Sequence, residues 1–494
     1  MTLKRLSLAV LAALLVGAAP ASPASDLHAA DRIRGHVEFL ASDLLEGRDT
    51  GSRGHLVAAS YVASEFRNLG LQPGGANGSY LLEVPFRRAT LAGTPAMSVT
   101  INGRTTKLVI GKDAAIRPSV THRQVALNVP LVFVGHGVRD GRLGIDDYAG
   151  LDVRGKIVVA LADAVPGIPT EISAHLQSMQ VQTAGDQGAI GLIEINDAIT
   201  AGNQVQRFGS RPVVDWVDAA GRSSRGSGAQ ALVALSPEWT ERLFERAPRQ
   251  LKAIRADAAA RKNVRGFPLP ATLSVTSASN WQDFTSPEVV AVLPGADPRL
   301  AQEHIVLMGH LDHLGLYADA KPGQDAIYNG ALDNAAGVAT MIEAARDFVE
   351  SGRPPRRSVL FIANTGEEYG LLGANYFASH PTVPAQSIVG LVDLDMPLLL
   401  YDFTDVVAFG ADHSTTGRAV AAAGASMHIG LSPDPLPQET LFVRSDHYPF
   451  VRQGVPAIFL MTGFANGGQQ AWQKFLAETY HTVKDDLSQP IRWQ

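Results

Sequence analysis

The last third of the chain alternates short apolar runs with amphipathic segments. From about residue 283 onward, each apolar run is long enough for a strand that is buried on both faces. Between these runs, residues 335–351 and 370–380 carry apolar positions at helical spacing. The alternation predicts an α/β fold with a mostly parallel central sheet and helices on both faces. The predicted strands are residues 289–293, 304–308, 358–364, 388–395 and 456–461.

Helical patterns also occur near the start of the chain. Residues 31–47 and 53–70 read as amphipathic helices, and the second ends at Gly70, a helix stop signal. We assign both to the same α/β domain. That domain is therefore predicted to be discontinuous, formed by residues 25–87 and 283–494.

The middle of the chain, residues 88–282, has a different pattern. It is richer in Gly and Val, and its apolar runs show hairpin spacing, as in residues 129–138, 151–163 and 187–197. We predict an inserted β-rich domain here. The Pro-containing stretch 267–287 is predicted to be the linker that returns the chain to the first domain.

The first 24 residues resemble a secretory signal peptide. A short basic start precedes an apolar core of about a dozen residues, and small residues then offer cleavage after Ala21 or Ala24. The apolar run is too short to cross a bilayer, and no later segment reaches about 18 uninterrupted apolar residues. We expect a secreted or periplasmic protein without a stable membrane anchor.

Composition narrows the chemistry. The 494 residues are 46% hydrophobic and 18% charged, with a formal net charge of −6, so nucleic acid is an improbable partner. The chain contains no cysteine, which excludes disulfides, thiolate catalysis and cysteine-ligated zinc. Any metal must therefore be held by His, Asp and Glu.

Titratable residues follow one predicted strand after another. His310 and Asp312 come just after strand 304–308, Glu367 and Glu368 follow strand 358–364, and Asp395 ends strand 388–395. Asp333 lies where helix 335–351 begins. Each group alone is ordinary, because an Asp at a helix start is usually a cap. Together they are informative, because ligands bind at the carboxyl ends of strands in open α/β sheets.

These residue types suit zinc. Zinc accepts imidazole nitrogen and carboxylate oxygen, and two neighbouring ions need a bridging carboxylate, for which Asp333 is a candidate. Adjacent glutamates in an extended segment point in opposite directions, so one can bind metal while the other accepts a proton. Asp312 can accept the second imidazole N–H of His310 and fix its tautomer. His481 in "YHTVKDD" offers one more nitrogen.

Six segments between residues 287 and 486 carry a family resemblance. In order, "GHLDHLG", "GALDNAAG", "NTGEEYGLLG", "VDLDM", "SDHYPF" and "YHTVKDD" resemble the motif blocks of the co-catalytic di-zinc exopeptidases. That family includes secreted bacterial aminopeptidases and glutamate carboxypeptidase. The segment from "LEGRDTGSRG" to "NLGLQP" resembles the family's N-terminal helices, and the insert is similar to its protease-associated domain.

The resemblance implies a role for each matched residue. It implies two zinc ions (Zn2+) and a peptide substrate, with Glu367 as general base and Asp312 orienting the first histidine. It also implies a cis peptide bond between Asp333 and Asn334. The implied ligands are His310 and Asp395 for one ion, Glu368 and His481 for the other, and Asp333 between them.

Three further residues have two readings each. Asp446 and His447 in "SDHYPF" are expected to line the substrate pocket, and the alternative is a capped turn before a strand. His313 has no metal role in the related motif, so we expect a structural role or a place on the substrate rim.

The function expected from the sequence is a zinc-dependent aminopeptidase. A carboxypeptidase or dipeptidase of the same architecture stays open, because Arg444 could meet a terminal carboxylate. A receptor-like binding protein, similar to transferrin receptor, is the alternative outside the enzymes, and it would purify without zinc. The sequence leaves the oligomeric state open.

Overall fold

The central sheet is built on four parallel strands. A computed structural model describes residues 23–196, 204–226 and 228–494. In it the parallel strands lie in the order β15, β14, β16 and β19. Two antiparallel strands flank them, β13 beside β15 and β17 beside β19, which confirms the predicted mostly parallel α/β sheet. The bounds are Phe267–Leu293 (β13), His304–His310 (β14), Ser358–Asn364 (β15), Ile388–Leu394 (β16), Asp405–Phe409 (β17) and Ala457–Thr462 (β19).

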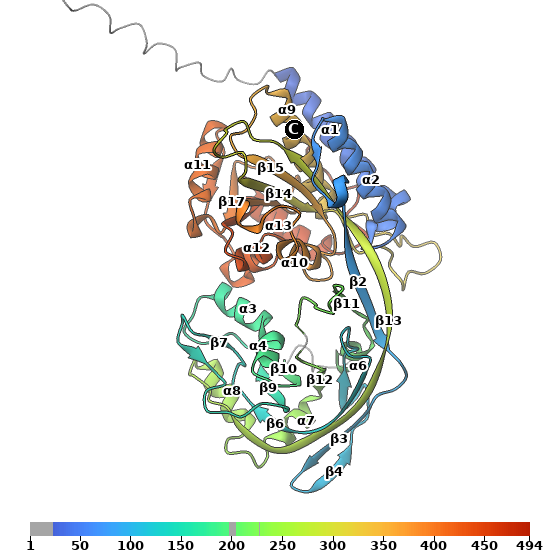
Figure 1. The fold of residues 1–494 in the computed structure, drawn as a ribbon, viewed down its shortest axis with the longest axis vertical. Coiled ribbons are helices and arrows are strands. Elements are labelled where there is room, and N and C mark those ends of the chain that lie inside the picture. Colours follow the sequence, from blue (N-terminus) through green and yellow to red (C-terminus); the bar gives the residue numbers. More distant parts are fainter. Residues whose placement is uncertain (1–22, 197–203, 227) are drawn as a thin grey trace, which may run out of the picture.

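Helices cover both faces of this sheet, as predicted (Figure 1). Strand β15 is buried at every position, and its side chains alternate between two cores. Phe361 packs with helices α1, α2 and α9, whereas Ile362 packs against the opposite face with α10 and α12. This alternation explains why the strand reads as a continuous apolar run. The helices span Pro23–Leu40 (α1), Arg53–Asn68 (α2), Ala336–Glu350 (α9), Leu372–Ser379 (α10) and Tyr448–Arg452 (α12).

Some elements of this domain differ from the prediction. The predicted helix 31–47 is interrupted after Leu40, and a 3-10 turn follows at Asp43–Arg48 with Glu46 in left-handed backbone conformation. Helix α11, Thr416–Ser426, was not predicted, because it buries only Gly417 and therefore has no apolar stripe. Strand β17, strand β18 (Gly430–Ser432) and helix α13 (Gly468–Glu478) were also missed.

The predicted return linker is instead one 27-residue strand, β13. It pairs with β3 and β6 in the insert and then with β2 and β15, so it runs through both lobes of the molecule (Figure 1). Its prolines suggested a linker, but buried and accessible positions alternate along its first half, as a strand requires. The partners are Leu81–Leu91 (β2), Ala96–Ile101 (β3) and Gln124–Phe133 (β6).

The insert is an α/β unit rather than a simply β-rich one. Strands β6, β9, β10 and β12 pair in parallel, and β3 and β4 form an antiparallel edge beyond β13. Its helices have seven to nine residues each, too short for their periodicity to stand out in the sequence. The other described strands of the insert are Arg104–Lys107 (β4), Ala114–Ile116 (β5), Arg139–Asp140 (β7), Ile145–Asp146 (β8), Ile157–Leu161 (β9), Gly191–Ile195 (β10), Val213–Trp216 (β11) and Ala231–Leu235 (β12). Its described helices are Thr170–Ser178 (α3), Gln180–Asp186 (α4), Gln204–Ser210 (α6), Pro237–Leu243 (α7) and Leu251–Ala259 (α8).

The carboxyl ends of the parallel strands point toward the insert. Strand β13 leaves the insert and pairs antiparallel with β15, with Val289 opposite Ala363 and Leu293 opposite Val359. The end of β15 is therefore its end nearest the insert. Thr170 of α3 donates a hydrogen bond to the Pro437 carbonyl at 2.8 Å, which ties the insert to the lobe above it.

The predicted signal peptide, residues 1–24, lies outside the described residues except for its last two positions. Within the described ranges, every helix is too short or too polar to cross a bilayer.

A buried carboxylate joins α1 to α9. Glu343 is only 6% exposed at its side chain, and it lies 2.7 Å from Arg32 of α1 and 3.0 Å from Arg346. Burial raises the pKa of Glu343, but the neighbouring His36 and the hydrogen bonds from Arg32 and Arg346 outweigh it and lower the pKa to about 2. A depressed carboxyl pKa stabilises the fold above the unfolded value, and this contribution is lost as pH falls toward 2.

We expect Glu343→Gln to lower the unfolding free energy by about 2 kcal/mol at pH 7, because the ionised partner of two guanidinium groups is lost. The difference from wild type should shrink as pH falls below about 4.5. Urea unfolding curves at pH 7 and pH 3 measure it. Glu350→Gln on the same helix, 59% exposed, is the matched control and should change stability by less than about 0.5 kcal/mol. An equal loss at both pH values would contradict the electrostatic origin.

Candidate metal centre

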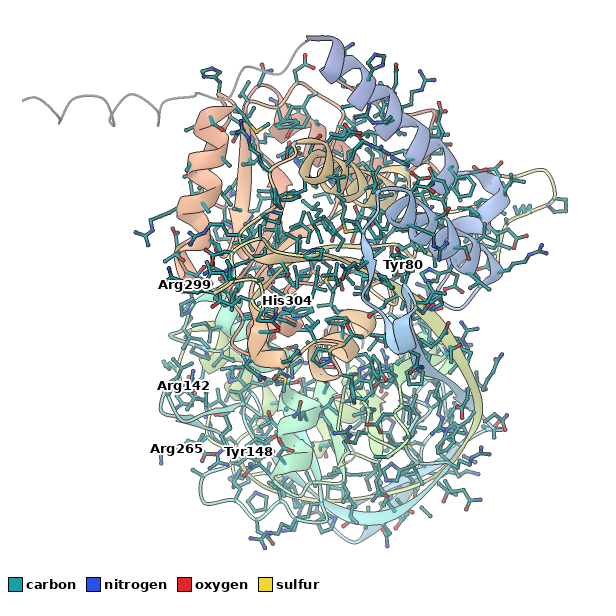
Figure 2. The ribbon with its side chains drawn as sticks, turned by 45° about the horizontal axis from the view of Figure 1, so that its top comes forward. Tyr80, Arg142, Tyr148, Arg265, Arg299 and His304 are labelled. Carbon is teal, nitrogen blue, oxygen red and sulfur yellow. The ribbon has the colours of Figure 1, made fainter. Side chains whose placement is uncertain are left out.

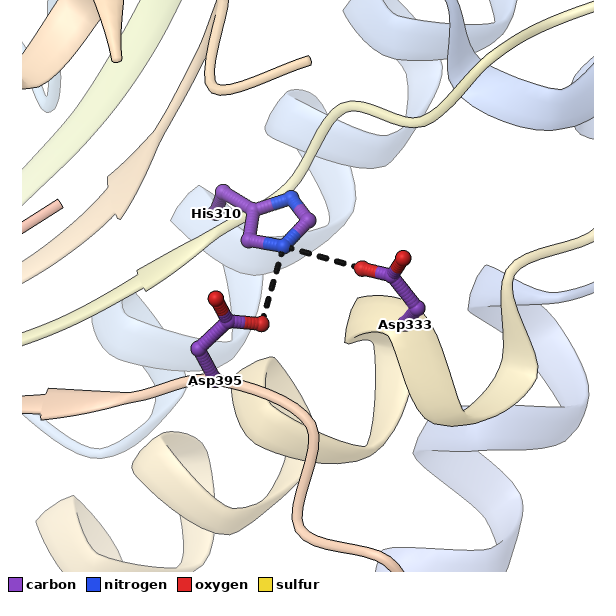
Figure 3. A group of neighbouring side chains, drawn as sticks. All are labelled: His310, Asp333 and Asp395. Carbon is purple, nitrogen blue, oxygen red and sulfur yellow. Dashed lines mark hydrogen bonds and ion pairs between the residues drawn. The ribbon is translucent and has the colours of Figure 1, made fainter. Parts of the chain in front are cut away.

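Three predicted ligands form a first group at the carboxyl edge of the sheet. His310 ends β14 and Asp395 directly follows the neighbouring strand β16, so parallel pairing brings them together. The His310 Nε2 atom lies 3.1 Å from Asp333 Oδ1 and 3.2 Å from Asp395 Oδ1 (Figure 3). All three residues are buried. One imidazole nitrogen thus faces two carboxylates from different elements, as in a metal site.

A second group shares Asp333 with the first. The His481 Nε2 atom lies 3.3 Å from Asp333 Oδ2 and 3.2 Å from Glu368 Oε2. Asp333 therefore turns one oxygen to His310 and the other to His481. This division is the geometry expected of a bridging carboxylate. The structure brings all five predicted ligands together.

His313 belongs to the second group as well. It is fully buried, and its Nδ1 atom lies 2.6 Å from Glu368 Oε1 and 3.9 Å from Asp333 Oδ2. Burial lowers the pKa of His313 to about 4, although the Asp333 carboxylate opposes the shift. A neutral, fully buried imidazole does not lie on a substrate rim, so of the two expected roles only the structural one agrees with this position.

The turn that carries Asp333 is held from two sides. The Asp485 carboxylate accepts hydrogen bonds from the backbone N–H groups of Leu332 and Asp333, each at 3.0 Å. The Asn334 side chain donates to the Leu394 carbonyl at 2.9 Å, and the bond between Asp333 and Asn334 is cis, as the resemblance implies. Sequence reasoning missed Asp485, although it lies in the quoted segment "YHTVKDD".

Gly337 allows this turn to approach β16 closely. A Cβ atom at this position would lie 2.1 Å from Asn334 Oδ1 and 2.3 Å from the Leu394 carbonyl oxygen. No side chain fits there, because real Cβ contacts are longer than 3 Å. This explains the last glycine of "GALDNAAG".

Asp312 orients the site through different atoms from those predicted. The His310 Nδ1 atom lies 3.0 Å from the backbone carbonyl oxygen of Asp312, not from its carboxylate. The carboxylate instead accepts from the Thr50 hydroxyl at 2.9 Å and from the N–H groups of Glu367 and Glu368 at 3.3 and 3.4 Å. Its role is therefore to position the Glu367–Glu368 turn, because backbone N–H groups there need a buried acceptor.

Arg48 fixes the segments on which the ligands lie. Its side chain is buried and donates to the carbonyls of Leu311, Asn329 and Gly330 at 2.9, 2.7 and 3.1 Å, and also to Leu40. Burial lowers the pKa of Arg48 to about 10, so the group stays protonated at neutral pH. Arg48 and Thr50 lie in the segment "LEGRDTG", which the sequence marked only as a family resemblance.

The electrostatics of the cluster call for a cation. Burial, and then the neighbouring Asp333 carboxylate, raises the pKa of Glu368 to about 8, and burial also raises the pKa of Asp395 and Glu367. Burial lowers the pKa of His310, but the carboxylates of Asp395 and Asp333 outweigh it and hold that pKa well above the ordinary range. The carboxylates thus outnumber the positive groups that face them.

The donor set fits zinc. Imidazole nitrogens and carboxylate oxygens are its ligands where cysteine is absent, and the chain has no cysteine. Glu368 Oε1 is buried, and its 2.6 Å contact with His313 Nδ1 does not meet hydrogen-bond geometry, so this oxygen has no hydrogen-bond partner among the described residues. Such atoms are costly unless a ligand satisfies them.

Asp446 and His447 lie behind the first group. Their side chains are buried, so neither lies on a solvent-open substrate wall in this structure. The His447 backbone N–H donates to Asp393 Oδ2 at 3.1 Å, and the Ser445 hydroxyl bonds to both Asp393 and Asp395 at 2.8 Å. The Ser445 hydroxyl therefore links this turn to Asp395, and Asp393 holds the turn itself; sequence reasoning missed both residues.

A family model for peptidase family M28 matches residues 288–494. Among curated proteins, a probable leucine aminopeptidase 2 of Aspergillus oryzae is 26% identical over 227 residues, 42% of this chain and 42% of that protein. The alkaline phosphatase isozyme conversion protein of Escherichia coli is 33% identical over 98 residues, 19% of this chain and 27% of that protein. A vacuolar membrane protease of Yarrowia lipolytica is 36% identical over 66 residues, 13% of this chain and 6% of that protein. The chain thus spans less than half the length of each of these relatives.

Two solved structures resemble nearly the whole chain. An aminopeptidase from Aneurinibacillus sp. strain AM-1 covers 94% of this chain and 89% of its own, with 22% identity and a TM-score of 0.49. A zinc aminopeptidase from Bacillus subtilis covers 94% and 90%, with 18% identity and a TM-score of 0.42. The family match includes all five residues of the two groups described above. Residues 288–494, which carry both groups, are therefore similar to peptidase family M28.

Proposed function

We propose that the protein is an exported zinc aminopeptidase that removes residues from the N-terminus of peptides and uses two zinc ions. The observation that carries the proposal is Asp333, whose two oxygens face two separate imidazole–carboxylate groups. Export is supported by the signal-like pattern of residues 1–24. Zinc bound in the two groups would supply Lewis acidity toward the scissile carbonyl and lower the pKa of water.

Glu367 is proposed to carry the proton. The side chain is half-buried beside the ligands, and its backbone N–H is anchored to Asp312 Oδ1 at 3.3 Å. Burial, against the opposing effect of His310, raises the pKa of Glu367 well above its ordinary value. A carboxylate with a raised pKa can take a proton from water and hold it long enough to pass it to the leaving amine.

Tyr480 is proposed to donate a hydrogen bond to the developing oxyanion. Its ring stacks on His481, with the centroids 3.8 Å apart. Burial and the Asp333 and Glu367 carboxylates raise the pKa of Tyr480. The hydroxyl therefore stays protonated at neutral pH, and a fixed O–H donor beside the ligands can stabilise negative charge as it forms.

The charge of the site favours a substrate amine over a substrate carboxylate. The ligand groups contain Asp333, Glu368 and Asp395, with Glu367 beside them. These four carboxylates would balance the charge of two zinc ions, which leaves no excess positive charge to hold a substrate carboxylate. Arg444, the residue that kept a carboxypeptidase open, is exposed, and its Nη1 lies 3.5 Å from the Glu439 carbonyl oxygen. A receptor-like protein without catalytic activity would not require all five metal ligands.

We expect Glu367→Ala to keep its zinc and to lose at least about 100-fold in kcat, because the proton acceptor is removed while every ligand remains. Zinc content by plasma mass spectrometry and hydrolysis of leucine 4-nitroanilide measure the two effects. Glu350→Ala, on an exposed face of α9, is the control for loss of a glutamate. A near-normal rate in Glu367→Ala would remove Glu367 from this role.

The wild-type chain should bind two zinc ions, and His481→Ala should bind one tightly, because His310, Asp333 and Asp395 remain in place. Metal titration after removal by a chelator counts the sites. His428→Ala, which deletes an exposed imidazole, should keep both ions. A single site in the wild-type chain would refute the two-ion proposal.

Peptides whose N-terminus is acetylated should not be cleaved, since acetylation removes the free amino group by which the proposed site would hold the first residue. Peptides amidated at the C-terminus should still lose their first residue. Mass spectrometry of the products shows which end is shortened. Release of the C-terminal residue from an acetylated peptide would establish the carboxypeptidase alternative instead.

A further inference from the structure

A cavity of about 290 Å³ lies between the insert and the peptidase domain. One wall comes from the insert, from helices α3 and α4 and the loop around Arg225. The other wall comes from α10 and α12 of the peptidase domain. The lining residues are Ser178, Met179, Val181, Gln182, Ser224, Arg225, Gly370, Leu371, Asn375, Val443, Tyr448, Pro449 and Arg452.

The cavity adjoins the proposed catalytic turn. The backbone N–H groups of Gly370 and Leu371, which form part of its wall, donate to the Glu367 carbonyl at 2.7 and 2.9 Å. Tyr448, which belongs to the same wall, directly follows His447 of the turn that carries Ser445. Both segments that shape the candidate site therefore continue into this cavity.

The two walls are held together by the insert. The Tyr448 hydroxyl and His175 Nδ1 of α3 form a short hydrogen bond, and their rings meet edge to face with centroids 5.8 Å apart. Trp216 of the insert donates from Nε1 to Asn375 of α10 at 2.9 Å. The cavity is thus a fixed part of the interface, with an insert residue bonded to each peptidase helix that lines it.

The lining of the cavity is cationic. It contains Arg225 and Arg452 and no acidic residue. Arg225 has one carboxylate neighbour, Asp215, at 3.8 Å. Arg452 is exposed and has no carboxylate partner within 4 Å in the described part of the chain, whereas Arg222, three residues before Arg225, is paired with Asp218 at 2.6 Å. A guanidinium group that faces a cavity without a partner is suited to an anionic ligand.

We propose that this cavity receives a carboxylate of the peptide substrate on the leaving-group side of the scissile bond. The inference rests on the proposed peptidase function. The carboxylate is either the C-terminus of a short peptide or an acidic side chain, because both offer the planar pair of oxygens that Arg binds with two parallel hydrogen bonds. The volume suits such a group rather than a folded segment. The insert thereby helps to select substrates through Arg225.

Three matched peptides test the proposal: a leucine-initiated tripeptide as the free acid, its C-terminal amide, and an amide with glutamate at the third position. For each enzyme variant, kcat/KM of either carboxylate peptide is divided by that of the plain amide. The wild-type ratio should be about 10, which corresponds to the free energy of one charge-assisted hydrogen bond. Arg452→Gln and Arg225→Gln should bring the ratio toward 1, mainly through KM. A preference confined to the free acid identifies the C-terminus as the ligand, and one confined to the glutamate peptide identifies the side chain.

Controls replace arginines elsewhere in each lobe. Arg299→Gln in the peptidase domain and Arg142→Gln in the insert remove exposed guanidinium groups that do not line the cavity, and they should keep the wild-type ratio (Figure 2). Equal kcat/KM for acid and amide in the wild-type enzyme would overturn the inference and leave the proposed function intact.

Calorimetry of the three peptides with zinc-loaded Glu367→Ala gives a readout that does not depend on turnover. Tighter binding of a carboxylate peptide that is lost in Glu367→Ala/Arg452→Gln supports the cavity assignment. This holds even if the wild-type chain hydrolyses none of the peptides, because absent hydrolysis would refute only the proposed function. Equal binding of acid and amide refutes the cavity assignment.

Discussion

The structure depends on one electrostatic constraint, which is the gathering of buried carboxylates around a few imidazoles. Carboxylates of Asp333, Glu368 and Asp395 face His310, His313 and His481 within 4 Å. Such a concentration of acids is tolerated only where cations and donors hold it. The surrounding fold supplies them, with Asp485 and Asp312 collecting backbone N–H groups and Arg48 collecting backbone carbonyls. These contacts fix the ligand segments, so the metal would complete an arrangement that the protein has already built.

Much of this arrangement could be predicted from local sequence. Strand β15 was predicted with its observed limits. A strand buried on both faces is a continuous apolar run, which can be identified from the local sequence alone. The ligands were predicted because each follows a strand or begins a helix, and parallel pairing brings those ends together. Zinc chemistry and the family resemblance then supplied the roles.

The parts that could not be predicted depend on contacts between distant residues. Nothing local shows that His310 bonds to the backbone of Asp312 rather than to its carboxylate, since this depends on where Thr50 and the Glu367 turn lie. Arg48 and Asp485 act on segments more than 150 residues away. Strand β13 was predicted as a linker because of its prolines. That it is one strand shared by both lobes depends on partners from distant segments, which no single stretch of sequence reveals.

The way in which the insert is attached determines how acidic and basic residues are arranged around the site. Strands β2 and β13 connect the insert with the central sheet in opposite directions, and the carboxyl ends of the parallel strands face back toward the insert. The acids of the metal centre and the two arginines of the interdomain cavity consequently lie on the same side of the sheet. A short peptide is itself a dipole, positive at its amino end and negative at its carboxyl end. Opposite fields at the two ends of a site orient such a dipole before any contact is made. Under the proposed function, the amino end of the peptide would lie at the metal centre and its carboxyl end at the two arginines.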